Sequence, residues 1–103
     1  MNKIGIFQVT DEKERDFAFM GLSQLKKLGK EVEKANYSQV WEGELNLSKY
    51  KNAEEICERI YSFANFQNPL GFKGQSISVS DVITVDNEAF YCDRIGFTKL
   101  NRF

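Results

Sequence analysis

The sequence contains no histidine, which removes both the most frequent general base and the most frequent metal ligand of proteins. Its two cysteines, Cys57 and Cys92, form no CxxC pair, and without a histidine partner they cannot build an ordinary zinc site. One proline and seven glycines are spread over 103 residues, so no flexible linker divides the chain. We therefore expect one domain that holds no metal and no other cofactor.

An excess of one charge and long apolar runs are also missing. Fourteen basic residues face fifteen acidic ones, whereas dedicated nucleic-acid binders are usually basic over a whole face. Residues 1–10 lack the apolar centre of a signal peptide, and no run reaches the roughly 18 apolar residues of a membrane span. We expect a cytoplasmic protein without membrane contact, whose thiols are reduced and buried.

Apolar residues are plentiful, at 42% of the chain, which is enough for a hydrophobic core. Alternating apolar side chains predict strands over 3–9 and 36–45, with a bulge in the second strand at Gly43. Leucines at helical spacing predict a short helix over about 20–28 that stops at Gly29.

The clearest pattern covers residues 53–65, where an apolar stripe recurs at helical spacing. Asn52 and Glu55 resemble a capping box at the start of this helix. Residues 11–19 fit a helix, a strand or a loop equally well, because Phe17 and Phe19 alternate as they would on a strand. We expect the stripe of the long helix to pack against a set of apolar side chains from the last third of the chain: Val79, Ile83, Val85 and Phe90.

The last third of the chain predicts a meander through "SISV", "DVITVD", "AFYCD" and "FTKL", with a turn at Asn87, since Asn tolerates left-handed geometry. The apolar residues of "DVITV" indicate burial on both faces of the sheet. The expected fold class is therefore α+β. We expect a small single domain over residues 1–103, with a curved antiparallel sheet packed by about two helices, at about 20–28 and 53–65.

The stretch "GQSISVSDVITV", residues 74–85, has two interpretations. On a half-buried strand its three alternating serines would share a wet face, and Asp81 would accept a backbone N–H at the strand junction. A binding surface is the second interpretation, since exposed polar residues outside the core often serve as docking sites. Catalysis is disfavoured, because a serine nucleophile needs a base and the chain has no histidine.

Other candidate groups have similar structural explanations. Four acidic residues of the last third could form carboxylate pairs, but turn and solvent-facing positions are more usual: Asp81, Asp86, Glu88 and Asp93. Lysines gather near the first helix and after it, at Lys26, Lys27, Lys30 and Lys34, although Glu31 and Glu33 dilute their charge. Tyr37 and Trp41 could stack on bases, but core packing is the default for such residues.

Several blocks resemble, in order and spacing, the YodL-like domain family: "IFQV", "RDFAFM", "LSQLKKLG", "ANYSQVWEGEL", "IYSFAN" before a proline, "FKGQSISVSDVI" and "FYCDRIGF". Gln75 departs from the family pattern, in which histidine or arginine is common at that position. The resemblance implies a bacterial domain, often encoded on conjugative elements and prophages, for which no catalytic residues are established.

From this resemblance we expect a non-enzymatic protein-interaction module. It would be an accessory, inhibitory or counter-defence factor of a conjugative element or prophage that binds a host or element protein. The expected partner-binding residues are Phe72, Lys73, Gly74, Ser76, Ser78, Ser80, Asp81, Asp93, Gly96 and Phe97. This surface should expose an apolar or aromatic patch near Phe72 or Phe97. The alternative is a small nucleic-acid-binding β-domain that combines aromatic stacking with Lys26, Lys27, Lys30 and Lys73.

Overall fold

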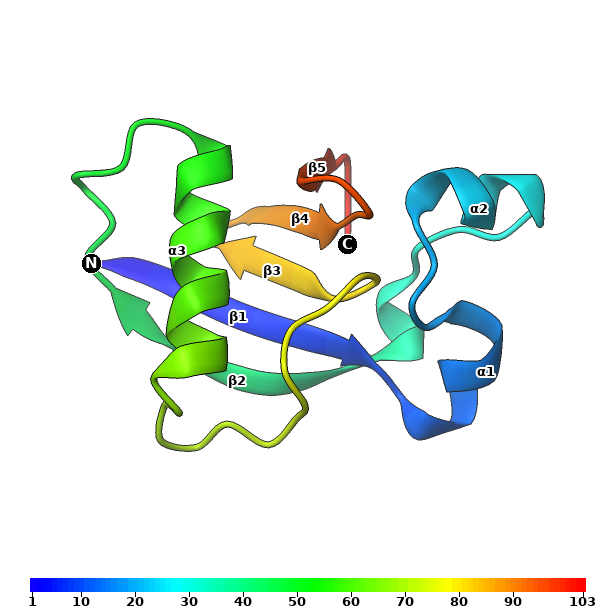
Figure 1. The fold of residues 1–103 in the computed structure, drawn as a ribbon, viewed down its shortest axis with the longest axis horizontal. Coiled ribbons are helices and arrows are strands. Elements are labelled where there is room, and N and C mark those ends of the chain that lie inside the picture. Colours follow the sequence, from blue (N-terminus) through cyan, green and yellow to red (C-terminus); the bar gives the residue numbers. More distant parts are fainter.

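Five strands form one antiparallel sheet in the computed structural model, which describes all residues, 1–103. The strands are β1 (Asn2–Val9), β2 (Tyr37–Leu45), β3 (Val82–Val85), β4 (Glu88–Cys92) and β5 (Phe97–Leu100). Their order across the sheet is β2-β1-β3-β4-β5, and every neighbouring pair is antiparallel. β2 curves along β1 (Figure 1). The predicted α+β fold with a curved antiparallel sheet is confirmed.

The long helix α3 (Ala53–Phe66) crosses one face of this sheet (Figure 1). Its predicted start is confirmed, because the Asn52 side chain accepts a hydrogen bond from the Glu55 N–H at 2.9 Å. The buried residues of its stripe share one core cluster with the inward-facing residues of the strands, including Cys57, Ile60, Ala64, Ile4, Ile6, Ile83, Val85 and Phe90. Val79, which was expected in this core, is only half-buried and lies outside the cluster.

A second core cluster covers the opposite face of the sheet, as the pattern of "DVITV" indicated. It contains Leu25 of α2 (Leu22–Lys27) together with Phe7, Val82, Ala89 and Tyr91. The predicted stop at Gly29 is confirmed, with φ at 71°. There the Lys30 N–H bonds the Leu25 carbonyl at 2.8 Å, and the Gly29 N–H bonds the Lys26 carbonyl at 3.1 Å. These two bonds form a Schellman motif, which satisfies carbonyls that the helix end would otherwise leave free.

Residues 11–19, which the sequence left open, begin with a 3₁₀ turn (Asp11–Lys13) that runs into the short helix α1 (Glu14–Phe17). A second 3₁₀ turn (Lys34–Asn36) leads into β2. Both α1 and α2 lie beyond the end of the sheet that α3 leaves uncovered (Figure 1). No helix of the structure has the length and apolarity that crossing a membrane requires.

The bulge of β2 lies at Val40 and not at Gly43, as the sequence had suggested. Ile6 pairs with Trp41 and Phe7 pairs with Gln39, so Val40 is the additional residue. Its carbonyl accepts the Lys73 N–H at 2.9 Å. Gly43 instead leaves room for an aromatic ring, because a Cβ there would lie 2.5 Å from the Trp41 indole.

The prediction that "SISV" forms a strand is wrong, because no strand lies between the end of α3 at Phe66 and the start of β3 at Val82. Side chains take the hydrogen-bonding groups that a neighbouring strand would otherwise pair. The Asn65 amide of α3 accepts the Ile77 N–H at 2.7 Å and donates to the Ile77 carbonyl at 3.2 Å. Ser80 then has φ at 87°, which is incompatible with an extended strand. Residues 74–81 therefore form an irregular segment, called the crossing below, which passes over β1 beside α3 (Figure 1).

Two smaller expectations are also resolved. The turn between β3 and β4 places its left-handed residue at Asp86, with φ at 56°, and not at Asn87. Both cysteines are free and buried, and both belong to the core cluster beneath α3. Burial raises the pKa of the Cys57 thiol to about 12 and also raises the pKa of Cys92.

Candidate functional site

A polar cleft of about 380 Å³ lies between the end of β1, the α1 segment and the irregular crossing. Six residues that the sequence nominated for partner binding line it: Lys73, Gly74, Ser76, Ser78, Ser80 and Asp81. The opposite wall contributes Asp11 and Glu14. A cleft of this size falls within the range of about 300–1,000 Å³ that is typical of small-ligand sites. The structure thus brings together most of the nominated residues around one cleft.

The Gln8 side chain attaches the crossing to β1. Its Nε2 donates to the Gln75 carbonyl at 2.8 Å, and its Oε1 accepts the Gln75 N–H at 3.0 Å. Gly74 must approach this side chain closely, because a Cβ there would lie 2.9 Å from Val40 and would collide with the Gln8 amide. The Gln8 amide therefore pairs with the Gln75 backbone as a neighbouring strand would, and this pairing holds one wall of the cleft in place.

Asp81 lies at the bottom of the cleft and is only 5% exposed. One carboxylate oxygen, Oδ2, accepts hydrogen bonds from the Gln8 Nε2 and the Ser78 N–H, both at 3.0 Å. Both bonds favour the ionised form, but burial outweighs them and raises the pKa of Asp81 to about 7. The carboxyl therefore changes its protonation near neutral pH. The expected backbone N–H bond to Asp81 is confirmed, although its donor precedes Asp81 by three residues.

Ser80 does not share a wet face with Ser76 and Ser78, contrary to the simple strand interpretation. It is 2% exposed, and its Oγ accepts the Phe19 N–H at 2.9 Å. Phe19 has φ at 62°, so this bond joins two residues in the left-handed region. Such conformations cost about 1–3 kcal/mol each and persist only where the surroundings enforce them.

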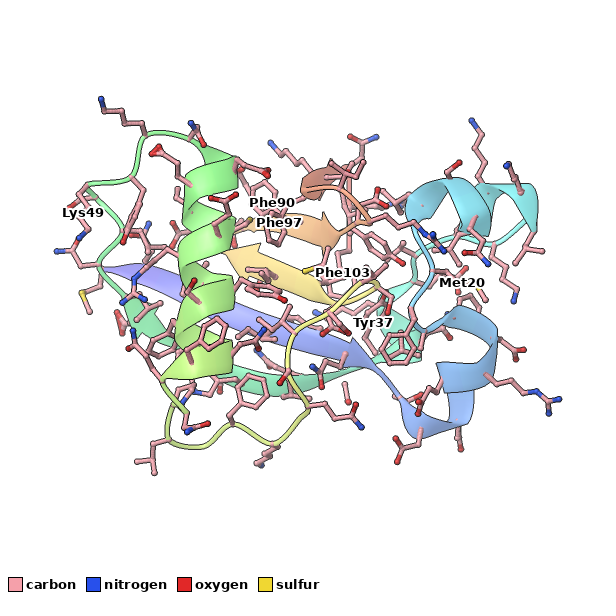
Figure 2. The ribbon with its side chains drawn as sticks, in the orientation of Figure 1. Met20, Tyr37, Lys49, Phe90, Phe97 and Phe103 are labelled. Atoms are coloured by element: carbon pink, nitrogen blue, oxygen red, sulfur yellow. The ribbon has the colours of Figure 1, made fainter.

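Two tyrosines provide part of that enforcement. The Tyr37 hydroxyl donates to the Ser80 carbonyl at 2.7 Å, and Figure 2 shows Tyr37 beside this turn. The Tyr91 hydroxyl donates to the Met20 carbonyl at 2.6 Å, which anchors the chain just after Phe19. Burial raises the pKa of both tyrosines, so both hydroxyls remain donors over the ordinary pH range.

The remaining nominated residues lie outside the cleft. Asp93 accepts the Leu22 N–H at 3.2 Å and the Thr98 hydroxyl at 3.3 Å, so its role is to hold α2 against the turn before β5. Gly96 forms that turn with φ at 69°. Neither residue lines the cleft, and Asp93 instead faces a separate shallow hollow beside Lys27 and Arg94.

The sequence predicted an exposed apolar or aromatic patch near Phe72 or Phe97, but these two rings do not form it, because both are half-buried against the core beneath α3. Phe97 packs against the core cluster that contains Phe90, and both residues are labelled in Figure 2. Neighbouring residues are exposed in their place: Leu70 is 98% exposed and Ile95 is 93% exposed. Both pairs show that the aromatic side chain turns inward while a nearby aliphatic residue in the loop points outward.

The aromatic residues proposed to stack on bases already have partners. The Trp41 indole packs edge-on against Phe63, with ring centroids 5.3 Å apart, and its Nε1 donates to the Leu70 carbonyl at 3.0 Å. The Tyr37 ring packs edge-on against Phe103 at 5.3 Å. Core packing, the default interpretation for both, is confirmed.

The lysines of the nucleic-acid alternative are divided between separate sites. Lys73 lines the cleft, whereas Lys27 lines the hollow beside Asp93. Lys30 lies 5.1 Å from the centre of the Phe17 ring, and Lys34 lies 5.7 Å from that of Phe7.

The four acidic residues of the last third also do not meet. Asp86 accepts the Lys3 N–H at 3.0 Å in an exposed turn, and this bond lowers its pKa. Glu88 forms an exposed ion pair with Lys99 at 3.5 Å. Asp81 alone is buried, contrary to the expectation of solvent-facing acids. No group of three His, Cys, Asp or Glu side chains is placed to hold a metal ion.

Sequence reasoning missed Gln8, Phe19 and the α1 wall as parts of the site. Gln8 carries a readable signal, because it continues the inward-facing series of Ile4 and Ile6 along β1. A polar residue at an inward strand position requires a buried partner, and here that partner is Asp81. Nothing in the local sequence around Phe19 indicated its unusual backbone conformation.

Comparison with known proteins identifies a family for this chain. No curated protein and no solved structure matches the chain significantly. The family model of the YodL-like domain matches residues 3–103, which include every helix, every strand except the first residue of β1, and the whole cleft. The chain therefore belongs to the YodL-like domain family.

Proposed function

We propose that this chain is a non-enzymatic protein-binding module, and that it captures its partner with the surface around residues 66–76. The observation that carries the proposal is the shape of the surface at this segment, where two hollows adjoin exposed apolar side chains. The polar cleft lies on one side of Gly74–Ser76, and a second hollow of about 240 Å³ lies on the other. Leu70 projects from the same segment with 98% of its surface exposed, and Phe66 is also exposed.

This combination matches the composition of protein interfaces, which place apolar anchors beside polar groups that hydrogen-bond across the contact. A side chain as exposed as that of Leu70 contributes almost nothing to the core of this chain. Its neighbour Gly71 has φ at 85°, and the carbonyl of Leu70 is fixed by the Trp41 indole. The backbone therefore holds the Leu70 side chain in a defined outward position, which favours binding to a partner.

Binding is favoured over catalysis because the buried polar groups of the cleft already have structural roles. Ser80 Oγ is occupied by the Phe19 N–H, and Asp81 Oδ2 is occupied by Gln8 and Ser78. One observation favours a second candidate: an aspartic acid whose pKa is about 7 also suits general acid–base catalysis. That candidate requires turnover of a substrate that contacts Asp81.

The family resemblance supplies the proposed setting. We infer that the partner is a bacterial protein in the cytoplasm, encoded by the host or by a mobile element, and that binding makes this chain an accessory, inhibitory or counter-defence factor. Nucleic-acid binding is the alternative, and its separated lysines and packed aromatic rings make it the weaker one.

The test is affinity capture of the tagged protein from bacterial lysate, with and without nuclease, read by mass spectrometry. The Leu70→Ser variant should lose a partner that the wild type retains after nuclease treatment. Ile95→Ser is the matched control, because Ile95 is equally exposed but lies in the turn before β5.

Three outcomes would contradict the proposal. Equal capture by wild type and Leu70→Ser would exclude the 66–76 surface. Loss of capture in Ile95→Ser alone would transfer the interface to the turn at 93–97. Partners that disappear with nuclease would favour the nucleic-acid alternative, for which binding should also weaken steeply as salt increases.

A further inference from the structure

The cleft contains a buried carboxylate with one unused oxygen. Asp81 is 95% removed from solvent, and both of its hydrogen bonds reach Oδ2. No fully buried side-chain nitrogen or oxygen in the chain lacks a partner. Since no hydrogen bond reaches Oδ1 and Asp81 lines the cleft, this oxygen must be the part of the carboxylate that the cleft exposes.

The charges that line the cleft favour a cation. Among the groups that line the cleft, Asp81, Asp11 and Glu14 are acidic, whereas Lys73 is the one basic group. The hydroxyls of Ser76 and Ser78 lie on the same wall and can accept further hydrogen bonds. A ligand that enters this cleft thus meets acceptors on several sides.

A guanidinium group fits these acceptors better than an ammonium group. Its five N–H donors lie in one plane, so it can bond a carboxylate oxygen and neighbouring hydroxyls simultaneously. It is also less strongly hydrated than an ammonium group, which lowers the cost of removing its water when it binds in the cleft. A bond between such a cation and an ionised carboxylate is about twice as strong as a neutral hydrogen bond.

We propose that the cleft receives an arginine side chain of the partner protein, with Asp81 Oδ1 as the principal acceptor of its guanidinium. This inference rests on the proposed protein-binding function and specifies the chemistry of the partner at the same surface. Leu70 would contact an apolar part of the partner while its arginine occupies the cleft.

The charge state of Asp81 gives the proposal a distinctive signature. The ionisable groups that face Asp81 are Tyr37 from β2, Tyr91 and Cys92 from β4, and the cleft residues Asp11, Glu14 and Lys73. Burial raises the pKa of Asp81 to about 7, and a guanidinium binds the ionised form. Binding therefore releases a proton, and the affinity should rise about tenfold between pH 6 and pH 8, as the ionised fraction does.

The test is an NMR titration of the ¹⁵N-labelled protein with N-acetyl-arginine amide at millimolar concentration. At pH 8 the probe should shift the amide signals of Gln8, Ser78 and Asp81. The citrulline analogue is the matched control, because it keeps the shape of arginine and lacks its charge. It should cause no comparable shift. Asp81→Asn should abolish the response to arginine.

Equal shifts from both probes, no shift with arginine at pH 8, or an unchanged affinity between pH 6 and pH 8 would each overturn the inference. The comparison of probes and of pH uses the wild-type protein, so it remains decisive even if Asp81→Asn fails to fold. Partner capture that depends on Leu70, combined with no arginine binding, would refute the arginine site and leave the proposed function intact. Arginine binding without any captured partner would support the arginine site and refute the proposed protein-binding function.

Discussion

Replacing Asp81 with asparagine removes one titrating group from the interior and keeps the shape of the side chain. The amide oxygen of asparagine can still accept the hydrogen bonds that Gln8 and the Ser78 N–H give to the carboxylate. The difference in unfolding free energy between the wild type and Asp81→Asn therefore isolates the cost of ionising this carboxyl in the folded protein.

The size and sign of this cost follow from the pKa of Asp81, which burial raises from 3.8 to about 7. Each unit of pKa corresponds to about 1.4 kcal/mol, so ionisation costs about 4 kcal/mol. Because the folded pKa lies above the unfolded one, the contribution of Asp81 to the unfolding free energy is fully present below pH 4. It is lost as the pH rises to about 7. Domains of this size are stable by about 5–15 kcal/mol, so the loss is a large fraction of the total.

The assay is urea denaturation at several pH values between 4 and 8.5, followed by the fluorescence of the single tryptophan, Trp41. The stability of the wild type relative to Asp81→Asn should fall by about 1.4 kcal/mol per pH unit from pH 4.5 to 7 and then level off. Asp86→Asn is the control of opposite sign, because hydrogen bonds lower the pKa of Asp86 and its contribution is lost as the pH falls. Parallel stability curves for the wild type and Asp81→Asn would refute the reasoning.

Gln8→Ala removes three hydrogen bonds that hold the crossing, so the free energy of unfolding should fall by about 2–3 kcal/mol. Hydrogen exchange at the Gln75 amide should also become faster, and unchanged protection of this amide would contradict the role of Gln8. Asn65→Ala leaves the buried N–H and carbonyl of Ile77 unpaired and should lower the free energy of unfolding by about 2 kcal/mol. Ser62→Ala, on the exposed side of α3, is the control and should change it little; equal effects would contradict the role of Asn65. Both cysteine thiols are buried and should react with a disulfide reagent at pH 8 only after unfolding, so rapid labelling of the native protein would contradict their placement.

The candidate site was only partly predictable. The polar segment from Lys73 to Asp81 was nominated from its composition, and the structure places it on a cleft. The accompanying strand interpretation failed because two distant side chains, Asn65 and Gln8, pair with its backbone. Side-chain-to-backbone pairing over such distances leaves no periodic trace in the segment itself.

Local patterns by themselves determined the long helix, its N-cap, the Schellman stop at Gly29 and the strands from β1 to β5. These features depend on apolar periodicity, cap chemistry and backbone preference, which act over a few residues. The sequence also determined that β3 is buried on both faces, since an apolar run cannot face water on either side without cost.

Only the tertiary structure decided the conformation and burial of the crossing. Ser80 adopts a left-handed backbone because Phe19 and Tyr37, far away in the chain, bond its hydroxyl and carbonyl. Asp81 acquires its raised pKa because packing of the crossing against β1 removes water from a residue that would be solvated in an isolated turn. These properties arise from contacts between segments that are distant in sequence, so no local pattern contains them.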